Sequence, residues 1–254
     1  IPAEKKALLE ALDEAVEEFN AIEVNDGQFP KVGIVGEIYV KYNAFSKNNA
    51  VEWLMKQGIE VVMPPFLEFF AGGLIHIQQK VKTNIARRDM LWLLTLLGKN
   101  ILRGFLDEVH GIMKKYQRFR HHTDIDTIAR NAQEILSLNH QYGEGWLIAG
   151  EIASFVKNGI PNVLCLQPFG CIANHIVAKG AEKKMRELYP QLNLLFLDAD
   201  AGVSEVNFFN RMHFFLNHAK ESGRVGLNIS GSGAGIEAEK WADSVLLTDL
   251  IQAD

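Results

Sequence analysis

Cys171 is the residue of this chain whose type and position are best suited to chemistry. It stands in the segment Gln167-Pro-Phe-Gly-Cys171, just after a short apolar run and just before a helical pattern that starts near Ala173. The amino-terminal end of a helix lowers the pKa of a thiol, and the thiolate is the form that attacks electrophiles and binds iron. A small buried residue in a tight turn is the alternative that the same residues allow.

Two neighbours of Cys171 bear on that chemistry. Cys165 lies inside the apolar run, where a cysteine more often packs as a small hydrophobic side chain. His175 lies one helical turn after Cys171, where it would act as a base or a metal ligand, or serve only a structural role. The Cys-x5-Cys spacing is not a standard metal motif, and two thiols do not supply the four ligands of a standard iron–sulfur cluster. No third partner at a recognisable spacing supports a zinc site or a Cys-His hydrolase.

Carboxylates also follow apolar runs. Glu37, Asp198 and Asp200 are expected either to act as acid–base groups and bind ligand hydroxyls, or to cap the next helix. Asn207 and Arg211 share one face of a predicted helix, where Arg211 pairs with a phosphate or with an acidic neighbour such as Glu205.

Two glycine patterns fall short of nucleotide-binding motifs. The segment Gly33-Ile-Val-Gly36 lacks the full dinucleotide fingerprint, and the segment 231–235 lacks the Gly-Lys-Ser/Thr ending of a phosphate-binding P-loop. We interpret 231–235 as a turn.

The elements that must position these residues alternate between strands and helices. Short apolar runs predict strands at 31–35, 59–63, 163–166, 194–197 and 225–229. Helical periodicity predicts helices at 3–20, 46–57, 66–82, 84–116, 124–139, 145–158, 173–188 and 203–220. Apolar strands joined by helices indicate an α/β, Rossmann-like, mostly parallel sheet. Ligands of such sheets bind beyond the carboxyl ends of the strands, so the loops after the strands are expected to meet at one edge.

The order of the elements predicts the domain organisation. A helix and linker at 1–30 precede a Rossmann-like domain made of 31–65 and 143–235. The almost entirely helical stretch 66–142 is an insertion into that domain, and 236–254 is a carboxyl-terminal helix or tail.

Composition excludes several classes of protein. The 254 residues are 48% hydrophobic and 22% charged, typical of a globular protein and unlike collagen, disordered chains or disulfide scaffolds. The net charge of −5 argues against nucleic-acid binding, and the basic segment 114–122 is interpreted as a solvated helix end or loop. The longest apolar run, at 90–97, is too short to span a membrane. Two cysteines and no visible secretory signal predict a cytoplasmic location. The opening Ile1-Pro2, without Met, suggests a fragment of a longer protein.

Four motifs resemble a known family. They are Lys31-Val-Gly-Ile-Val-Gly-Glu-Ile-Tyr-Val-Lys-Tyr-Asn43, Gly143-Glu-Gly-Trp146, Gln167-Pro-Phe-Gly-Cys171, and Asp198-x-Asp-x-Gly-x-Ser-Glu-x-Asn207 with Asn210-Arg211. Over roughly residues 30 to 215 the chain resembles the carboxyl-terminal region of activase-related proteins of 2-hydroxyacyl-CoA dehydratases. That region is similar to the subunits of the dehydratases and of benzoyl-CoA reductases.

The resemblance implies a cofactor, partners and site residues. Its relatives hold an iron–sulfur cluster, of the four-iron, four-sulfur kind, on cysteines from several loops, accept an electron from an ATP-dependent activator, and act on acyl-CoA thioesters. The cluster ligand that it implies here is Cys171, with Cys165 as the second thiol, and the remaining cysteines are expected before residue 1. The residues expected to line the ligand-binding cleft are Gly36, Glu37, Tyr39, Asn43, Glu144, Gln167, Phe169, Gly170, His175, Asp198, Asp200, Glu205, Asn207 and Arg211.

Two functions from different classes follow. The first is an iron–sulfur redox module that receives electrons from an ATP-dependent activator and acts on acyl-CoA. The second is a scaffold or ligand-binding domain of a larger activase-related protein that carries no cluster. A third, a thiol enzyme with Cys171 as nucleophile and His175 as base, would show rapid alkylation of Cys171 at neutral pH.

Overall fold

The central feature of the fold is a four-stranded, all-parallel sheet. The computed structural model describes residues 2–24, 27, 29–45, 49–119, 122–200 and 202–227, with the backbone alone for residues 2 and 221–227. The strands are β1 (Lys31–Gly36), β2 (Glu60–Val62), β3 (Asn162–Gln167) and β4 (Asn193–Asp198), in the order β2-β1-β3-β4. Val32 pairs with Val61 on one side and with Asn162 on the other, and Asn162 pairs with Asn193.

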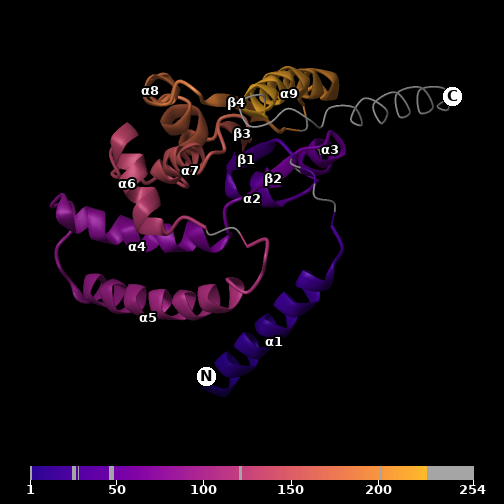
Figure 1. Cartoon of the computed structure of the whole chain (residues 1–254). Helices are drawn as coiled ribbons and strands as arrows, with labels where there is room; N and C mark the ends of the chain where they lie inside the picture. The colour runs from indigo at the N-terminus through magenta and orange to yellow at the C-terminus, as the bar shows by residue number, and fades with distance from the viewer. Residues whose placement is uncertain are drawn as a thin grey trace.

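Helices cover both faces of this sheet (Figure 1). Side chains alternate between faces along each strand, so Val35 and Cys165 enter one core while Ile34 and Leu164 enter the other. The first core is closed by α7 (Trp146–Lys157), a π-helix η1 (Ile172–Ala178) and α8 (Glu182–Leu188). The second is closed by α3 (Ala50–Lys56) and α9 (Glu205–Leu227). The predicted α/β, Rossmann-like fold is therefore confirmed.

The stretch between β2 and α7 is helical. It holds α4 (Leu67–Lys82), α5 (Met90–Met113) and α6 (Ile125–Ile135), and α4 and α5 run side by side (Figure 1). A third apolar core joins this block to α7, because Ile75 of α4 and Ile128 of α6 cluster with Trp146 of α7. The amino-terminal helix α1 (Pro2–Ala21) packs on α5 through ion pairs such as Lys5–Glu108, whose Nζ and Oε1 are 2.6 Å apart. No helix in the described ranges combines the length and apolar character needed to cross a bilayer.

Most predicted helices and strands are present. The structure differs from the prediction at three places, which are α2, the helix at 173–188 and the strand at 225–229. A short helix, α2 (Ile38–Tyr42), directly follows β1 where a loop was expected. The predicted helix 173–188 is divided into η1 and α8 around Gly180, where a side chain would meet the Ile176 carbonyl oxygen.

The predicted strand at 225–229 is wrong where it can be compared. Residues 225–227 continue α9, because a helix that has already formed gains one hydrogen bond for each residue added. Residues 228–229, the turn at 231–235 and the tail at 236–254 lie outside the described residues.

Candidate functional site

The strand order of the sheet changes direction between β1 and β3. From β1 the chain builds β2 on one side, and after the helical block it builds β3 on the other. In an open α/β sheet this arrangement leaves a crevice outside the carboxyl ends of the two strands, where ligands bind. The residues at that edge are Gly36-Glu37 after β1 and Gln167-Pro168 after β3.

Gly36 allows the two strands to approach closely at this edge. Its φ is +126°, and a Cβ at this position would lie 1.9 Å from the carbonyl oxygen of Leu166. The next backbone amide, that of Glu37, donates to the same oxygen at 2.9 Å. Only glycine fits this backbone conformation and spacing.

Two carboxylates hold the first turn of α2. Glu37 is its N-cap, and its side chain accepts a hydrogen bond from Val40 N at 2.8 Å. Of the two roles expected for Glu37, capping is therefore the one observed. Glu144, from the loop before α7, accepts from Ile38 N at 2.8 Å. Burial raises the pKa of Glu144 above its ordinary value, and the Glu37 carboxylate adds to the shift.

Three polar side chains meet beyond β3 and β4. Nε2 of Gln167 donates to Oδ1 of Asp198 at 2.7 Å and lies 3.2 Å from Nε2 of His175. The same ring nitrogen of His175 is 3.3 Å from Oδ1 of Asp198. The structure thus brings together three residues that the sequence predicted separately, at the ends of two adjacent strands and on η1.

This cluster has unused hydrogen-bonding capacity. Oε1 of Gln167 and Nδ1 of His175 are both buried and have no hydrogen-bond partner among the described residues. Gln167 is fully buried. An unpaired buried polar atom costs roughly 1–3 kcal/mol, so each is a place where a ligand group or water gains free energy by binding.

The Nδ1 atom of His175 can serve a ligand in two ways. If Nε2 accepts from Gln167, the ring proton is on Nδ1, which then donates to a ligand. If Nε2 donates to Asp198, Nδ1 carries a lone pair and accepts, in the manner of a base oriented by a carboxylate. Gln167 Oε1 is an acceptor in both cases.

The loop between β3 and η1 forms the outer wall of the edge. Gly170 has a φ of +77°, and the backbone N–H of Phe169 donates to Oδ2 of Asp200 at 2.6 Å. The Phe169 ring is 79% exposed and meets the His175 ring edge-on, with 5.7 Å between centroids. The expected grouping of Phe169, Gly170 and Asp200 at this edge is therefore observed.

The two cysteines have different environments. Cys165 is fully buried in β3, and burial, with the nearby Glu151 carboxylate, raises the pKa of its thiol well above the ordinary value. Cys171 is the N-cap residue of η1 and is partly exposed. The environment of Cys165 favours a core side chain over a metal ligand.

A complete cluster site is not present in the part of the chain that the structure describes. Within those residues, no group of three or more His, Cys, Asp or Glu side chains is arranged to hold a metal ion. Cys171 is the single accessible thiol at the edge, whereas a standard cluster takes four ligands. The residues present therefore do not fit a whole iron–sulfur cluster.

Five residues of the predicted cleft lie on, or at the end of, the helices α2 and α9. Tyr39 is 64% exposed on α2, and Asn43 ends that helix, where its Oδ1 accepts from Phe45 N at 2.9 Å. Glu205, Asn207 and Arg211 lie on α9. Arg211 donates to the Phe196 carbonyl oxygen at 2.8 Å, and its pairing with a phosphate or with Glu205 stays a prediction.

Three polar residues beside the site were not predicted from the sequence. Lys41 and Glu151 form a buried ion pair at 3.1 Å between α2 and α7, and Asn174 contacts both cysteines. The signal for Glu151 was present in the sequence, because it is the one charged residue in the mostly apolar segment 146–156. A charge in that position requires a buried partner.

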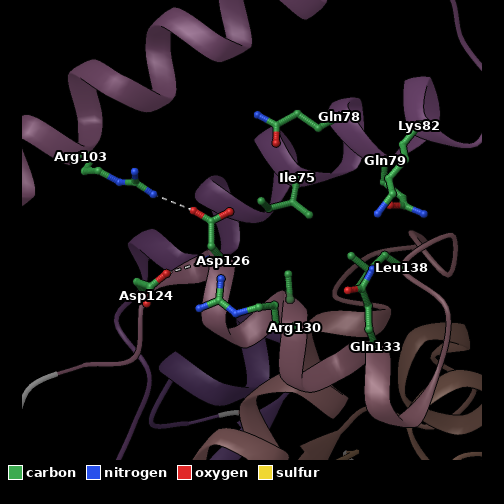
Figure 2. A pocket seen from close by; sticks show the side chains of 11 residues that line it. Ile75, Gln78, Gln79, Lys82, Arg103, Asp124, Asp126, Arg130, Gln133 and Leu138 are labelled. Atoms are coloured by element: carbon green, nitrogen blue, oxygen red, sulfur yellow. Dashed lines mark hydrogen bonds and ion pairs between the residues drawn. The ribbon is translucent and has the colours of Figure 1, made fainter.

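A polar groove in the helical block is a separate feature. Figure 2 shows side chains from α4, α5 and α6 around it, with Arg103 pointing at Asp126. Most of its charges are engaged with one another: Asp126 accepts from Arg103 and Lys99, and Asp124 caps α6. We interpret this groove as the polar seam that joins the three helices.

Comparison with known proteins finds no match for this chain. No family model matches the chain, and neither a curated protein nor a solved structure is similar enough to count as a match. The resemblance to dehydratase-like proteins therefore rests on the four motifs.

Proposed function

We propose that this chain is the ligand-binding α/β module of a larger activase-related protein, and that it holds an acyl-CoA thioester beyond the carboxyl ends of β3 and β4. The observation that carries the proposal is the pair of buried, unpartnered atoms, Gln167 Oε1 and His175 Nδ1, at that edge. The thioester class comes from the resemblance of the motifs. The proposal requires no cluster on this chain.

The charges at the edge favour one part of such a ligand. Glu37, Asp198 and Asp200 are carboxylates, so the phosphates of coenzyme A would be repelled and would lie toward solvent. The pantetheine arm is neutral and carries amide and hydroxyl groups that both donate and accept. Its donors match Gln167 Oε1, and its donors or acceptors match the two states of His175 Nδ1.

Calorimetric titration with acetyl-CoA and with pantetheine tests this proposal. We expect both to bind wild type, and Gln167→Met to weaken binding about 3- to 10-fold by removing one hydrogen-bond acceptor. Gln191→Met is the matched control, since Gln191 is an exposed amide in the turn before β4, at the opposite end of that strand from Asp198. Failure of wild type to bind either compound, or equal binding by Gln167→Met, would reject the proposal.

A second function is favoured by the exposure of Cys171 at the same edge. In it, the chain is a redox module in which Cys171 supplies one thiolate to an iron–sulfur cluster served by an ATP-dependent activator. The remaining ligands would come from outside the described residues. The test is iron and acid-labile sulfide per chain after anaerobic reconstitution, in wild type, Cys171→Ser and Cys165→Ser. Loss of both only in Cys171→Ser supports it, and their absence from wild type excludes cluster binding by this chain.

A further inference from the structure

A cavity of about 320 Å³ lies on the β1/β2 side of the sheet, away from the Gln167 cluster. Its walls come from Val62 of β2, the first turn of α4, and one side of α7. Its volume is at the lower end of the range for small-molecule sites. The apolar part of the lining consists of Val62, Pro64, Ile128, Phe155 and Ile160.

Two carboxylates face this cavity, and Lys41 forms an ion pair with one of them. Glu151 is held by Lys41, whose Nζ is 3.1 Å and 3.3 Å from its two oxygens. Glu68, on α4, also lines the cavity, and its Oε2 atom is buried without a hydrogen-bond partner in the described part of the chain. When Glu68 is ionised, it and Glu151 share the single charge of Lys41, so the pair of carboxylates carries one negative charge in excess of that cation.

The other polar groups of the wall are already engaged. Ser154 donates to the Gly150 carbonyl oxygen at 2.7 Å and accepts from Asn131 at 2.9 Å. Asn158 donates to Thr123 at 2.9 Å. Among these polar groups of the wall, Glu68 is the one with an oxygen, Oε2, that can still accept a hydrogen bond from a ligand.

We propose that this cavity binds a small organic ammonium ion, with its charged nitrogen on Glu68 and its apolar body against Val62, Ile128 and Phe155. The ammonium group supplies both the positive charge and the hydrogen-bond donor that Glu68 Oε2 lacks. The apolar walls take up the hydrocarbon part of the ligand. This site is independent of the acyl-CoA proposal.

Binding of an ammonium ion must depend on pH. Burial, with the Glu151 carboxylate, raises the pKa of Glu68 to about 8, while Lys41 opposes the shift. The other titratable groups nearby are Tyr42 of α2, whose pKa burial and the two carboxylates raise, and the lining residues Lys31 and His122. Only ionised Glu68 pairs with a cation, and its ionised fraction rises from about 0.1 at pH 7 to about 0.9 at pH 9.

The test is calorimetric titration of the full chain with 2-phenylethylammonium, with 2-phenylethanol as the uncharged comparison. We expect the ammonium to bind about 10-fold more tightly at pH 9 than at pH 7 and to release about 0.9 proton per site at pH 7, measured in two buffers of different ionisation enthalpy. Glu68→Gln should remove both effects, and Glu52→Gln, at an exposed carboxylate on α3, should retain them.

Three results would overturn the inference. They are absence of ammonium binding to wild type up to millimolar concentration, equal binding of 2-phenylethanol, and affinity that does not change between pH 7 and pH 9. Tighter binding of the alcohol at pH 7 than at pH 9 would point instead to a neutral ligand that accepts from protonated Glu68. Proton release is measured on wild type, so it shows whether ammonium binding is coupled to loss of a proton even if Glu68→Gln does not fold.

Discussion

Cys165 and Cys171 form hydrogen bonds with opposite ends of one side-chain amide, that of Asn174. Sγ of Cys165 donates to Oδ1 of Asn174 at 3.5 Å, and Nδ2 of Asn174 donates to Sγ of Cys171 at 3.1 Å. Asn174 is fully buried on η1, so it fixes both sulfurs relative to the sheet. The Asn174 side chain therefore links the two thiols through hydrogen bonds, and of the two only Cys171 is partly exposed to solvent.

The first prediction concerns thiol reactivity. Iodoacetamide should label Cys171 in the folded chain and label Cys165 at least about 100-fold more slowly, because Cys165 becomes accessible only when the sheet opens. Mass spectrometry of peptides after timed labelling measures both rates. In urea the two rates should become similar. Equal rates in buffer would contradict the burial of Cys165.

The second prediction concerns the buried ion pair. Lys41→Met should destabilise the fold by about 3–5 kcal/mol, because it leaves Glu151 charged or protonated in a site without a partner. The double variant Lys41→Met with Glu151→Leu should recover most of that loss, since it removes both charges. Urea denaturation gives the free energies of unfolding. A loss below 1 kcal/mol for Lys41→Met would show that Glu151 is solvated.

The third prediction concerns Gly36. Gly36→Ala should cost about 2 kcal/mol or more, because its φ is positive and the added Cβ would overlap the Leu166 carbonyl oxygen. Gly73→Ala is the matched control: Gly73 lies inside α4 with open space around it, so the change should be neutral or stabilise by up to about 1 kcal/mol. Thermal unfolding of the two variants distinguishes these outcomes, and a stable Gly36→Ala protein would contradict the described β1–β3 contact.

The fourth prediction concerns stability against pH. The pKa of Glu68 is about 8 in the folded chain and about 4.5 when unfolded, so the folded state binds more protons between these values. The free energy of unfolding should therefore fall as pH rises from about 5 to about 8, by at most about 5 kcal/mol from this group.

Glu68→Gln isolates that contribution, because glutamine keeps the neutral form at every pH. The difference in stability between wild type and this variant should be small near pH 5 and grow toward pH 9 in favour of the variant. Urea denaturation at several pH values measures it. A difference that stays constant with pH would mean that Glu68 titrates normally.

The sequence predicted three strands, β1, β3 and β4, to within one residue at each end, whereas the strand predicted at 225–229 was wrong where it can be compared. β1, β3 and β4 are each buried on both faces, so they appear as continuous apolar runs bounded by glycine, proline or polar residues. The short helix α2 was not predicted, because its first turn depends on Glu144, which lies 106 residues away from Ile38. A contact of that range leaves no local pattern.

The candidate site was predicted in part for a similar reason. Gln167 and Asp198 end parallel strands, so their position at one edge follows from the fold class alone. Their adjacency depends on strand order, which a single sequence does not reveal. The contact of Arg211 with the Phe196 carbonyl oxygen was not predicted, because it joins α9 to β4 and leaves no local pattern.

The strand order also determines when the binding edge can exist during folding. β3 and β4 are near in sequence, and the contact between Asn162 and Asn193 closes a loop of only 31 residues. The contact between Asn162 and Lys31, across the β1/β3 seam, closes one of 131. Because closing a long loop costs more entropy, the β1–β2 and β3–β4 pairs are expected to form first and to join last, after the helical block has collapsed. We therefore expect the crevice to be the last part of the sheet to assemble, and each half to expose until then an unpaired edge on which another chain can add a strand.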